Sequence, residues 1–397
     1  MANQTQTLTA SREMRFLLSC ARVFLGTAQA DVLEVRHGTA PNWERVLEMA
    51  RWHRLDPMVY EVLKNYPEGT VTAPVRARLA EAFQHNVRRN MVLCAVLAEI
   101  QDLARQRGLV IVPIKGLTLS QIAYGNLVVR RSRDLDLLVH PRDWQNAVAL
   151  LEHLGFRQPV PLADHHRPIL LGSAKELKFI RDGILVELHW RFADLPEMFP
   201  FPMDSLHEST ETLALGGLSV PVLRLPHLIP YLCYHGCFHL WFRLFWLCDL
   251  AALTGSKAEP DWEQVVAEAA ALQQTPCLLL GFGLARRLLE NPVPAPIERL
   301  FHQQPHCGRL IDQLSGFLLR ESGVDKPYAV HVSGFQTLRW SLHLRQGFFS
   351  KIRVGWRFLT QPRLTDLEAF PLPRRLFPLY RLIRPLRLLG RWLFAGG

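Results

Sequence analysis

Two aspartates separated by one residue, Asp134 and Asp136, have the types and spacing to do chemistry. Residues 130–139 read as a β-strand entered through a basic turn, with apolar residues in its second half. Side chains alternate across a strand, so both carboxylates leave the same face about 7 Å apart. Carboxylates so placed repel each other unless a cation lies between them, and hard cations such as Mg²⁺ prefer oxygen ligands. The pair therefore predicts a magnesium site.

A third carboxylate, Glu187, lies in the second half of a predicted hairpin. Residues 176–180 and 184–190 are joined by an Asp-Gly pair, a strong signal for a two-residue hairpin turn. Glu187 shares a strand face with His189, and a glutamate in so apolar a strand needs a partner such as a metal. Taken singly, the aspartates also fit a solvent-facing strand entry and Glu187 an edge-strand charge. Together the three carboxylates favour metal binding.

A possible anion site precedes the aspartates. Residues 109–114 read as a short buried strand, Lys115 and Gly116 as a turn, and residues 117–124 as a helix. A strand that turns through glycine into a helix presents free backbone N–H groups and the positive end of the helix dipole. Lys115, Thr118 and Ser120 would add a charge and two hydroxyl donors. The alternative interpretation is an ordinary turn.

The order of these motifs resembles the nucleotidyltransferase fold of the DNA polymerase β superfamily. More narrowly it is similar to a bacterial group of uncharacterised nucleotidyltransferase-like proteins with a Lys-Gly turn, an Arg-x-Ser-x-Asp-x-Asp strand and a Glu-Leu-His-Trp strand. The residues at those positions are Arg130, Ser132, Asp134, Asp136 and Glu187. The resemblance implies an α+β fold in which a mixed sheet is flanked by an N-terminal helical region and a C-terminal helical lobe.

The resemblance also implies a reaction, the Mg²⁺-dependent transfer of NMP from an NTP to a hydroxyl or phosphate acceptor with release of pyrophosphate. Asp134 and Asp136 would hold one or two Mg²⁺ ions, and Glu187 would share a metal and help to deprotonate the acceptor. Lys115 to Thr118, with Arg130 and Ser132, would bind phosphates. The acceptor, which is a small molecule, peptide, glycan or protein, is not specified. The rival hypothesis is a catalytically weak nucleotide-binding module that acts at a membrane surface or on a biosynthetic partner.

Two histidines one helical turn apart, His235 and His239, alternate with Cys233 and Cys237. We expect the histidines to line the cleft beside the nucleotide or to bond Asp249 in the core. Zinc binding is the alternative, although one helix cannot direct all four side chains at one ion.

Composition suggests four parts along the 397 residues: a helical region (1–107), the nucleotidyltransferase core (108–225), a helical lobe (226–370) and a basic C-terminal segment (371–397). The last part carries six arginines and no acidic residue, more than half of the net charge of +10. Arginine interleaved with Leu, Trp and Phe is typical of an interfacial membrane helix. The alternative is a helix packed on the catalytic lobe, and nucleic-acid binding is less well supported.

The odd number of cysteines, seven, suits buried thiols in a reducing compartment better than a disulfide framework. Residues 228–253 are long and apolar enough to suggest a membrane span. Their histidines, arginine and aspartate favour a buried helix instead. Residues 15–30 fit an amphipathic helix better than a signal peptide. We therefore expect a cytoplasmic protein, or one peripheral at the inner face of the membrane.

Overall fold

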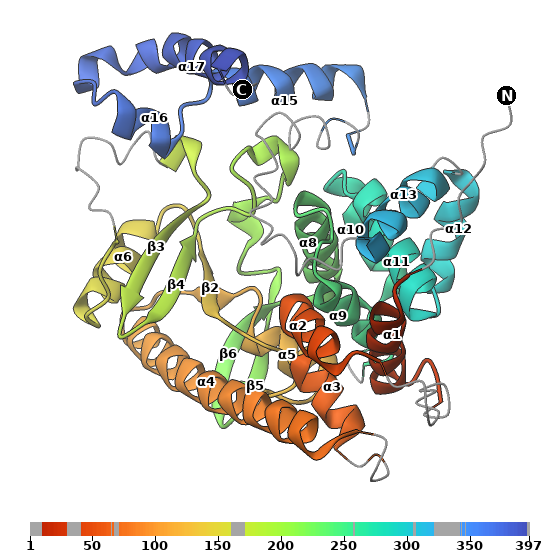
Figure 1. Ribbon diagram of the computed structural model, residues 1–397. Coiled ribbons are helices and arrows are strands. Elements are labelled where there is room, and N and C mark those ends of the chain that lie inside the picture. The colour runs from red at the N-terminus through yellow and green to blue at the C-terminus, as the bar shows by residue number, and fades with distance from the viewer. Residues whose placement is uncertain are drawn as a thin grey trace, which may run out of the picture. The chain divides into compact units, whose positions relative to one another are not determined.

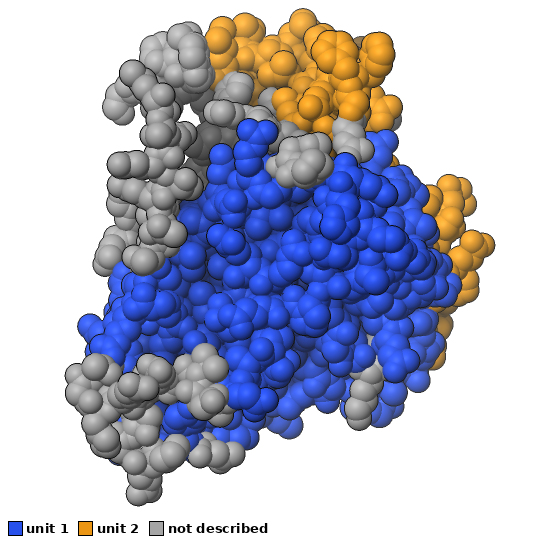
Figure 2. All heavy atoms as spheres, turned by 90° about the vertical axis from the view of Figure 1, so that its right-hand side faces the viewer, with its two compact units in different colours: residues 1–98, 114–133, 211–331 blue, residues 99–113, 134–210, 332–397 orange. Residues whose placement is uncertain are grey.

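The structure of the chain, a computed structural model, describes residues 10–29, 41–64, 66, 71–159, 171–256, 259–304, 307–320, 342, 344–345 and 347–394. The chain divides into two compact units, each assembled from segments that are separate in the sequence (Figure 2). Unit 1 comprises residues 1–98, 114–133 and 211–331, and unit 2 comprises residues 99–113, 134–210 and 332–397. The mixture of helices with a small mixed sheet confirms the α+β class. The four-part division along the sequence stays a prediction.

Unit 2 contains a four-stranded sheet in the order β1-β2-β4-β3. Figure 1 labels three of these strands, β2, β4 and β3. Its strands are β1 (Ile111–Pro113), β2 (Asp134–Val139), β3 (Glu176–Arg181) and β4 (Ile184–His189). The outer pairs are antiparallel, whereas β2 and β4 are parallel neighbours. Parallel strands need a crossover connection, and α6 (Trp144–His153) lies in that connection. Its Trp144 packs on Trp190, directly after β4, with ring centroids 6.0 Å apart.

The predicted hairpin is confirmed. Asp182 and Gly183 join β3 to β4 with φ values of 49° and 72°, the left-handed conformation that a type I′ hairpin turn requires at both positions. This turn fixes the register, so Lys178 lies opposite Glu187 and Glu176 opposite His189.

The C-terminal part of unit 2 is helical. It contains α15 (Phe348–Thr360), α16 (Leu364–Ala369), the 3₁₀ helix η5 (Arg374–Leu379) and α17 (Tyr380–Phe394). Helix α15 packs against α17, and the buried Arg384 of α17 donates to Phe358 O (3.0 Å) and to Asp366 Oδ2 (2.7 Å). Gln361 Nε2 donates to Gly172 O at 3.0 Å, which ties this region to the segment before β3. Two short 3₁₀ helices, η3 (Pro196–Met198) and η4 (Met203–Ser205), follow β4.

Unit 1 is built mainly of helices, and several begin where capping chemistry predicts. The Asn42 side chain accepts from Arg45 N at 3.2 Å at the start of α2, and Ser11 caps α1. The helices are α1 (Arg12–Leu25), α2 (Trp43–His53), α3 (Asp56–Leu63), most of α4 (Ala73–Gln106), α5 (Leu117–Tyr124), α8 (Leu225–Phe238), α9 (Leu244–Thr254), α10 (Trp262–Ala271), α11 (Thr275–Leu289), α12 (Ala295–Gln303) and α13 (Cys307–Arg320). Strands β5 (Thr210–Leu215) and β6 (Leu218–Leu223) form a separate two-stranded sheet.

The apolar stretch 228–253 is buried as predicted, but it forms two helices rather than one. The chain breaks between α8 and α9 at Leu240 and Trp241, which adopt φ values of 53° and 52°. The break returns the Trp241 ring onto Gly236, where a Cβ would lie 2.4 Å from the indole, so only glycine leaves room. In the part of the chain that the structure describes, no helix combines the length and apolarity needed to span a bilayer.

Candidate functional site

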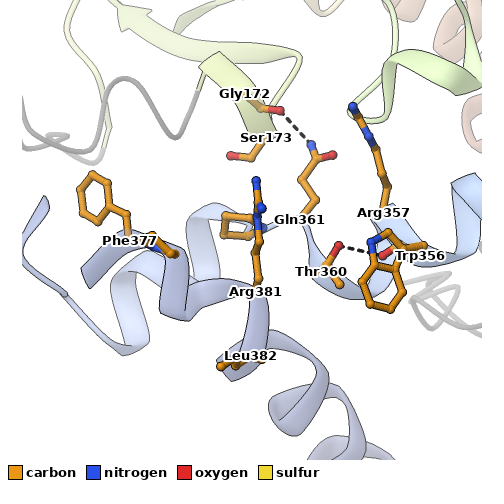
Figure 3. Close-up of a pocket in the computed structure, with 11 residues that line it drawn as sticks. Gly172, Ser173, Trp356, Arg357, Thr360, Gln361, Phe377, Arg381 and Leu382 are labelled. Atoms are coloured by element: carbon orange, nitrogen blue, oxygen red, sulfur yellow. Dashed lines mark hydrogen bonds between the residues drawn. The ribbon is translucent and has the colours of Figure 1, made fainter. Parts of the chain in front are cut away.

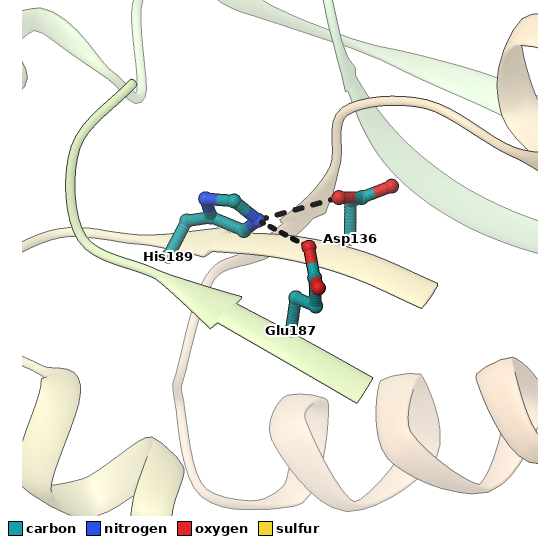
Figure 4. Close-up of side chains that lie close together, drawn as sticks. All are labelled: Asp136, Glu187 and His189. Atoms are coloured by element: carbon teal, nitrogen blue, oxygen red, sulfur yellow. Dashed lines mark hydrogen bonds and ion pairs between the residues drawn. The ribbon is translucent and has the colours of Figure 1, made fainter. Parts of the chain in front are cut away.

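Asp136, Glu187 and His189 meet on one face of the unit 2 sheet (Figure 4). Asp136 on β2 lies directly opposite Glu187 on β4, and the two-residue period of a strand places His189 on the same face. One ligand atom from each side chain lies within 4.8 Å of the other two. Among the described residues, no other group of three or more His, Cys, Asp or Glu side chains meets this distance.

His189 is fully buried between carboxylates. Its Nε2 lies 3.3 Å from Asp136 Oδ1 and 3.8 Å from Glu187 Oε2, and its Nδ1 lies 3.4 Å from Glu176 Oε2. Burial, with a smaller contribution from Lys175, lowers the pKa of His189, so the imidazole is neutral at pH 7. A neutral imidazole has one N–H, so one of its nitrogens presents a lone pair to a carboxylate oxygen. A cation bound at that nitrogen would remove this unfavourable contact.

Glu187 is held in a strongly negative environment. Burial raises the pKa of Glu187 most, and the nearby carboxylates of Glu176 and Asp136 raise it further. Lys178 opposes this effect, because its Nζ lies 3.0 Å from Glu187 Oε1. The Lys178 side chain is 54% exposed, so its ammonium group stands at the solvent side of the cluster rather than inside it. Lys175 forms an ion pair with Glu176, so three carboxylates and two lysines surround the buried His189.

The donor set fits one divalent cation. Two carboxylates suit Mg²⁺ or Mn²⁺, and a neutral imidazole adds a nitrogen ligand that is more typical of transition metals. Glu176 beside Nδ1 matches the carboxylate that often orients a metal-bound histidine from behind. Asp136, Glu187 and His189 are the residues that can hold such an ion.

Asp134, the remaining predicted metal ligand, is the first residue of β2. It is half-buried, and its Cα pairs in register with Leu185 rather than with an acidic residue. Its carboxylate does not belong to the close group formed by Asp136 and its neighbours. A metal-binding role for Asp134 stays a prediction.

The predicted phosphate-binding turn lies in unit 1. Helix α5 begins at Leu117 as predicted, and Gly116 precedes it with a φ of 70°. The hydroxyl of the buried Thr118 donates to Lys115 O at 3.2 Å. Lys115, Gly116 and Thr118 are therefore adjacent at a helix N-terminus, and their binding of phosphate stays a prediction.

Arg130 and Ser132 are also in unit 1 and are buried. The Arg130 guanidinium forms an ion pair with Asp249 at 3.0 Å, and Asp249 also accepts from Tyr124 OH at 2.9 Å. The backbone of this segment is fixed by Asn90, whose Nδ2 donates to Arg130 O at 2.9 Å. The Ser132 hydroxyl is buried and has no hydrogen-bond partner among the residues described. Phosphate binding by Arg130 and Ser132 is likewise untested.

His235 and His239 lie at the end of α8 in unit 1. Their ring centroids are 4.7 Å apart, and both contact the Trp246 ring, at 5.3 and 5.5 Å. Cys233 and Cys237 are buried, and burial raises the pKa of both thiols well above the ordinary value. Within the described ranges, none of these four side chains belongs to a close group of metal-binding residues, so the zinc alternative receives no support. A nucleotide contact by the two histidines stays a prediction.

The sequence interpretation gave no role to His189, Glu176 or Lys178. The two-residue alternation already placed His189 beside Glu187, and the Asp-Gly turn fixes Glu176 and Lys178 opposite them. The hairpin register carries the signal for these three residues, whereas the motifs contain only Asp134, Asp136 and Glu187.

Residues 39–290, more than half of the chain, match the model of a family described as uncharacterised nucleotidyltransferase. The matched range runs from the residues before α2 to the end of α11 and contains all four strands of the unit 2 sheet. Comparison with curated proteins and with solved structures returns no match.

Proposed function

The chain belongs to this family of uncharacterised nucleotidyltransferases, and we propose that it transfers NMP from an NTP to a hydroxyl or phosphate acceptor with release of pyrophosphate. The convergence of Asp136, Glu187 and His189 carries this proposal. Asp136 and Glu187 would hold the metal, with Asp134 on the same strand as a further ligand. A bound Mg²⁺ would supply positive charge to the phosphates during in-line displacement.

The protein side chains around this site have separate tasks. Glu187, whose raised pKa makes it a better proton acceptor than an ordinary carboxylate, would take the proton of the acceptor hydroxyl. His189 would complete the metal site with a nitrogen ligand, since it is fully buried and its Nε2 lies 3.3 Å from Asp136 Oδ1. Lys178 would compensate the charge of Glu187 while no substrate is bound.

Nucleotide binding would involve residues of unit 1. Lys115, Gly116 and Thr118 at the start of α5, with Arg130 and Ser132, would contact phosphates. His235 and His239 form a half-exposed aromatic group with Trp246 that suits stacking on a base. Alanine at both histidines is expected to raise KM for the NTP more than it lowers kcat.

We place the reaction in the cytoplasm, where NTPs are available and thiols stay reduced. All seven cysteines are free, and six of them are buried. The acceptor is a hydroxyl or phosphate on a small molecule, peptide, glycan or protein.

The test measures pyrophosphate release from each NTP with Mg²⁺ or Mn²⁺ and a cell extract as the source of acceptor. The wild type is compared with Asp136→Asn, which removes the charge of a buried metal ligand at constant shape. Asp204→Asn is the control, because Asp204 lies in the same unit and its side chain is 81% exposed. We expect Asp136→Asn to lower the rate at least about a hundredfold and Asp204→Asn to leave it unchanged.

Equal rates for the wild type and Asp136→Asn would contradict the proposal. Metal-dependent NTP binding without pyrophosphate release would instead support the rival hypothesis of a catalytically weak nucleotide-binding module.

A further inference from the structure

Helix α15 in unit 2 exposes a row of large apolar side chains. Phe348, Phe349, Ile352 and Trp356 are 73%, 84%, 52% and 67% exposed. Their spacing places them within about 100° of arc on the helix. The buried Val354 and Phe358 fall on the opposite side. The row is therefore the outer face of α15. It exposes more large apolar side chains than is usual for a helix that packs only within its own unit.

Helix α17 repeats this arrangement. Leu382, Leu386 and Leu389 are 66%, 68% and 51% exposed, at the i, i+4 and i+7 spacing of one helical stripe. Tyr380 and Arg384 lie on the other side of the helix and are buried. Because α15 and α17 pack against each other, the two helices form one body with two exposed apolar rows. We call this body the α15–α17 surface, defined by these seven exposed apolar residues.

The two rows meet at a cavity of about 910 Å³ (Figure 3). Trp356 and Leu382, one from each row, both line it, together with Arg357 and Arg381. In Figure 3 Arg381 extends from α17 toward Ser173. The cavity therefore combines apolar walls with guanidinium groups.

The two arginines differ in their partners. Arg357 Nε lies 3.1 Å from Glu197 Oε1, so part of its charge is neutralised. Arg381 is exposed and has no hydrogen bond or ion pair with any residue that the structure describes. A cation without a partner beside apolar side chains favours an anionic ligand that also has an apolar part.

The charge of the surrounding sequence also favours an anionic ligand. Residues 347–394 contain ten arginines and lysines but only two acidic residues, Asp366 and Glu368. Asp366 is already bound by Arg384 and Arg387, so it does not offset the exposed cations. A second copy of this surface would bring like charges together, which is unfavourable. An anionic partner is favoured instead.

We propose that the α15–α17 surface docks on an anionic phospholipid bilayer. Amphipathic helices with arginines on the polar side and Phe, Trp and Leu on the other lie in the plane of the membrane interface. Aromatic side chains such as Trp356 suit the headgroup level, and arginines are attracted to anionic headgroups. The proposal does not depend on nucleotidyl transfer.

The test is co-sedimentation of the full chain with vesicles of equimolar phosphatidylcholine and phosphatidylglycerol, and with vesicles of phosphatidylcholine alone. The variant Phe348→Ser with Phe349→Ser removes two of the most exposed apolar side chains. Its matched control is Met91→Ser with Val92→Ser, because these side chains of α4 are 66% and 49% exposed in unit 1. Arg381→Gln tests the charge, with the exposed Arg88→Gln as its control. Circular dichroism melts check that each variant folds.

We expect the wild type to bind the anionic vesicles more strongly than the neutral ones and to be released by salt. The double phenylalanine variant should bind at least about tenfold more weakly, and Arg381→Gln about fivefold more weakly, with both controls unchanged. Failure of the wild type to bind, equal binding to both vesicle types, or unchanged binding of the two test variants would overturn the proposal. Self-association of the wild type that the phenylalanine variant abolishes would assign the surface to a second copy and would also overturn it.

Discussion

His189 Nε2 lies 3.3 Å from Asp136 Oδ1, although the imidazole is fully buried and burial lowers its pKa. Because Glu176 faces the other ring nitrogen at 3.4 Å, the single N–H of the neutral ring cannot serve both carboxylates. With no cation bound, the ring nitrogen that lacks a proton faces a carboxylate oxygen, which is unfavourable. A cation bound at that nitrogen would make the contact favourable. If Asp136, Glu187 and His189 hold a cation as proposed, that cation should stabilise the contact between His189 and Asp136.

His189→Gln should weaken the binding of Mn²⁺, used as a spectroscopic substitute for Mg²⁺, at least about tenfold. Glutamine keeps a polar group but lacks the ring that spans Asp136 and Glu176. Electron paramagnetic resonance of free Mn²⁺ gives the affinity. His140→Gln is the control, because His140 in the same unit is only partly buried and bonds to the exposed Asp204. Equal losses in both variants would rule out a specific role for His189.

Metal affinity should rise with pH through the titration of Glu187. Protons compete with the metal for this carboxylate, and burial raises its pKa, so the rise should come at a higher pH than for an ordinary glutamate. Lys178 lowers the pKa of Glu187, so Lys178→Met should move the midpoint to still higher pH. Calorimetric titration with Mn²⁺ between pH 5 and 8 measures both. If Lys178→Met does not change the pH at the midpoint of the rise in Mn²⁺ affinity, the titration of Glu187 does not control metal binding.

Local chemistry in the sequence predicted much of this site. The Asp-Gly pair fixed the hairpin, and two-residue alternation placed Glu187 and His189 on one face. Local patterns could not predict the parallel pairing of β2 with β4, because these strands lie more than 40 residues apart. This pairing sets Asp136 rather than Asp134 opposite Glu187.

The break between α8 and α9 was also not predictable from local patterns, because the apolar run has no glycine or proline at Leu240 and Trp241. The indole packs on Gly236, five residues before Trp241, and Trp241 N donates to Gly236 O at 2.8 Å within the same turn.

Asp249→Asn should lower the free energy of unfolding by about 3–5 kcal/mol, because it leaves the buried Arg130 guanidinium without a counter-ion. Urea unfolding followed by tryptophan fluorescence measures the loss. Asp312→Asn is the matched control: it breaks the Arg287 ion pair, whose side chains are both 65% exposed, and should cost less than about 1 kcal/mol. Similar losses for the two variants would mean that Arg130 finds solvent or another acceptor.

His53 should make the protein less stable in mild acid. Burial and then Arg243 lower the pKa of His53 to about 3, so it stays neutral in the folded state when the unfolded chain, with a pKa of 6.5, takes up a proton. The contribution of His53 to the free energy of unfolding is therefore fully present above its unfolded pKa of 6.5 and is lost as the pH falls below that value. Between pH 7 and 5 the wild type should lose about 2 kcal/mol more than His53→Gln. Parallel pH profiles of urea unfolding would contradict the buried neutral state.

Gly236→Ala should destabilise unit 1 although alanine favours helices. A Cβ at this position would lie 2.4 Å from the fully buried Trp241 ring, so the expected cost is about 1–3 kcal/mol. Gly308→Ala is the matched control, since it lies in α13 with no atom within 4 Å of the added Cβ. That control should keep or slightly raise the stability, because Gly308 lies in the first turn of α13, where helix propensity contributes less than in a helix interior. Thermal unfolding compares the two, and a gain in both would mean that the indole can leave Gly236 without loss of packing.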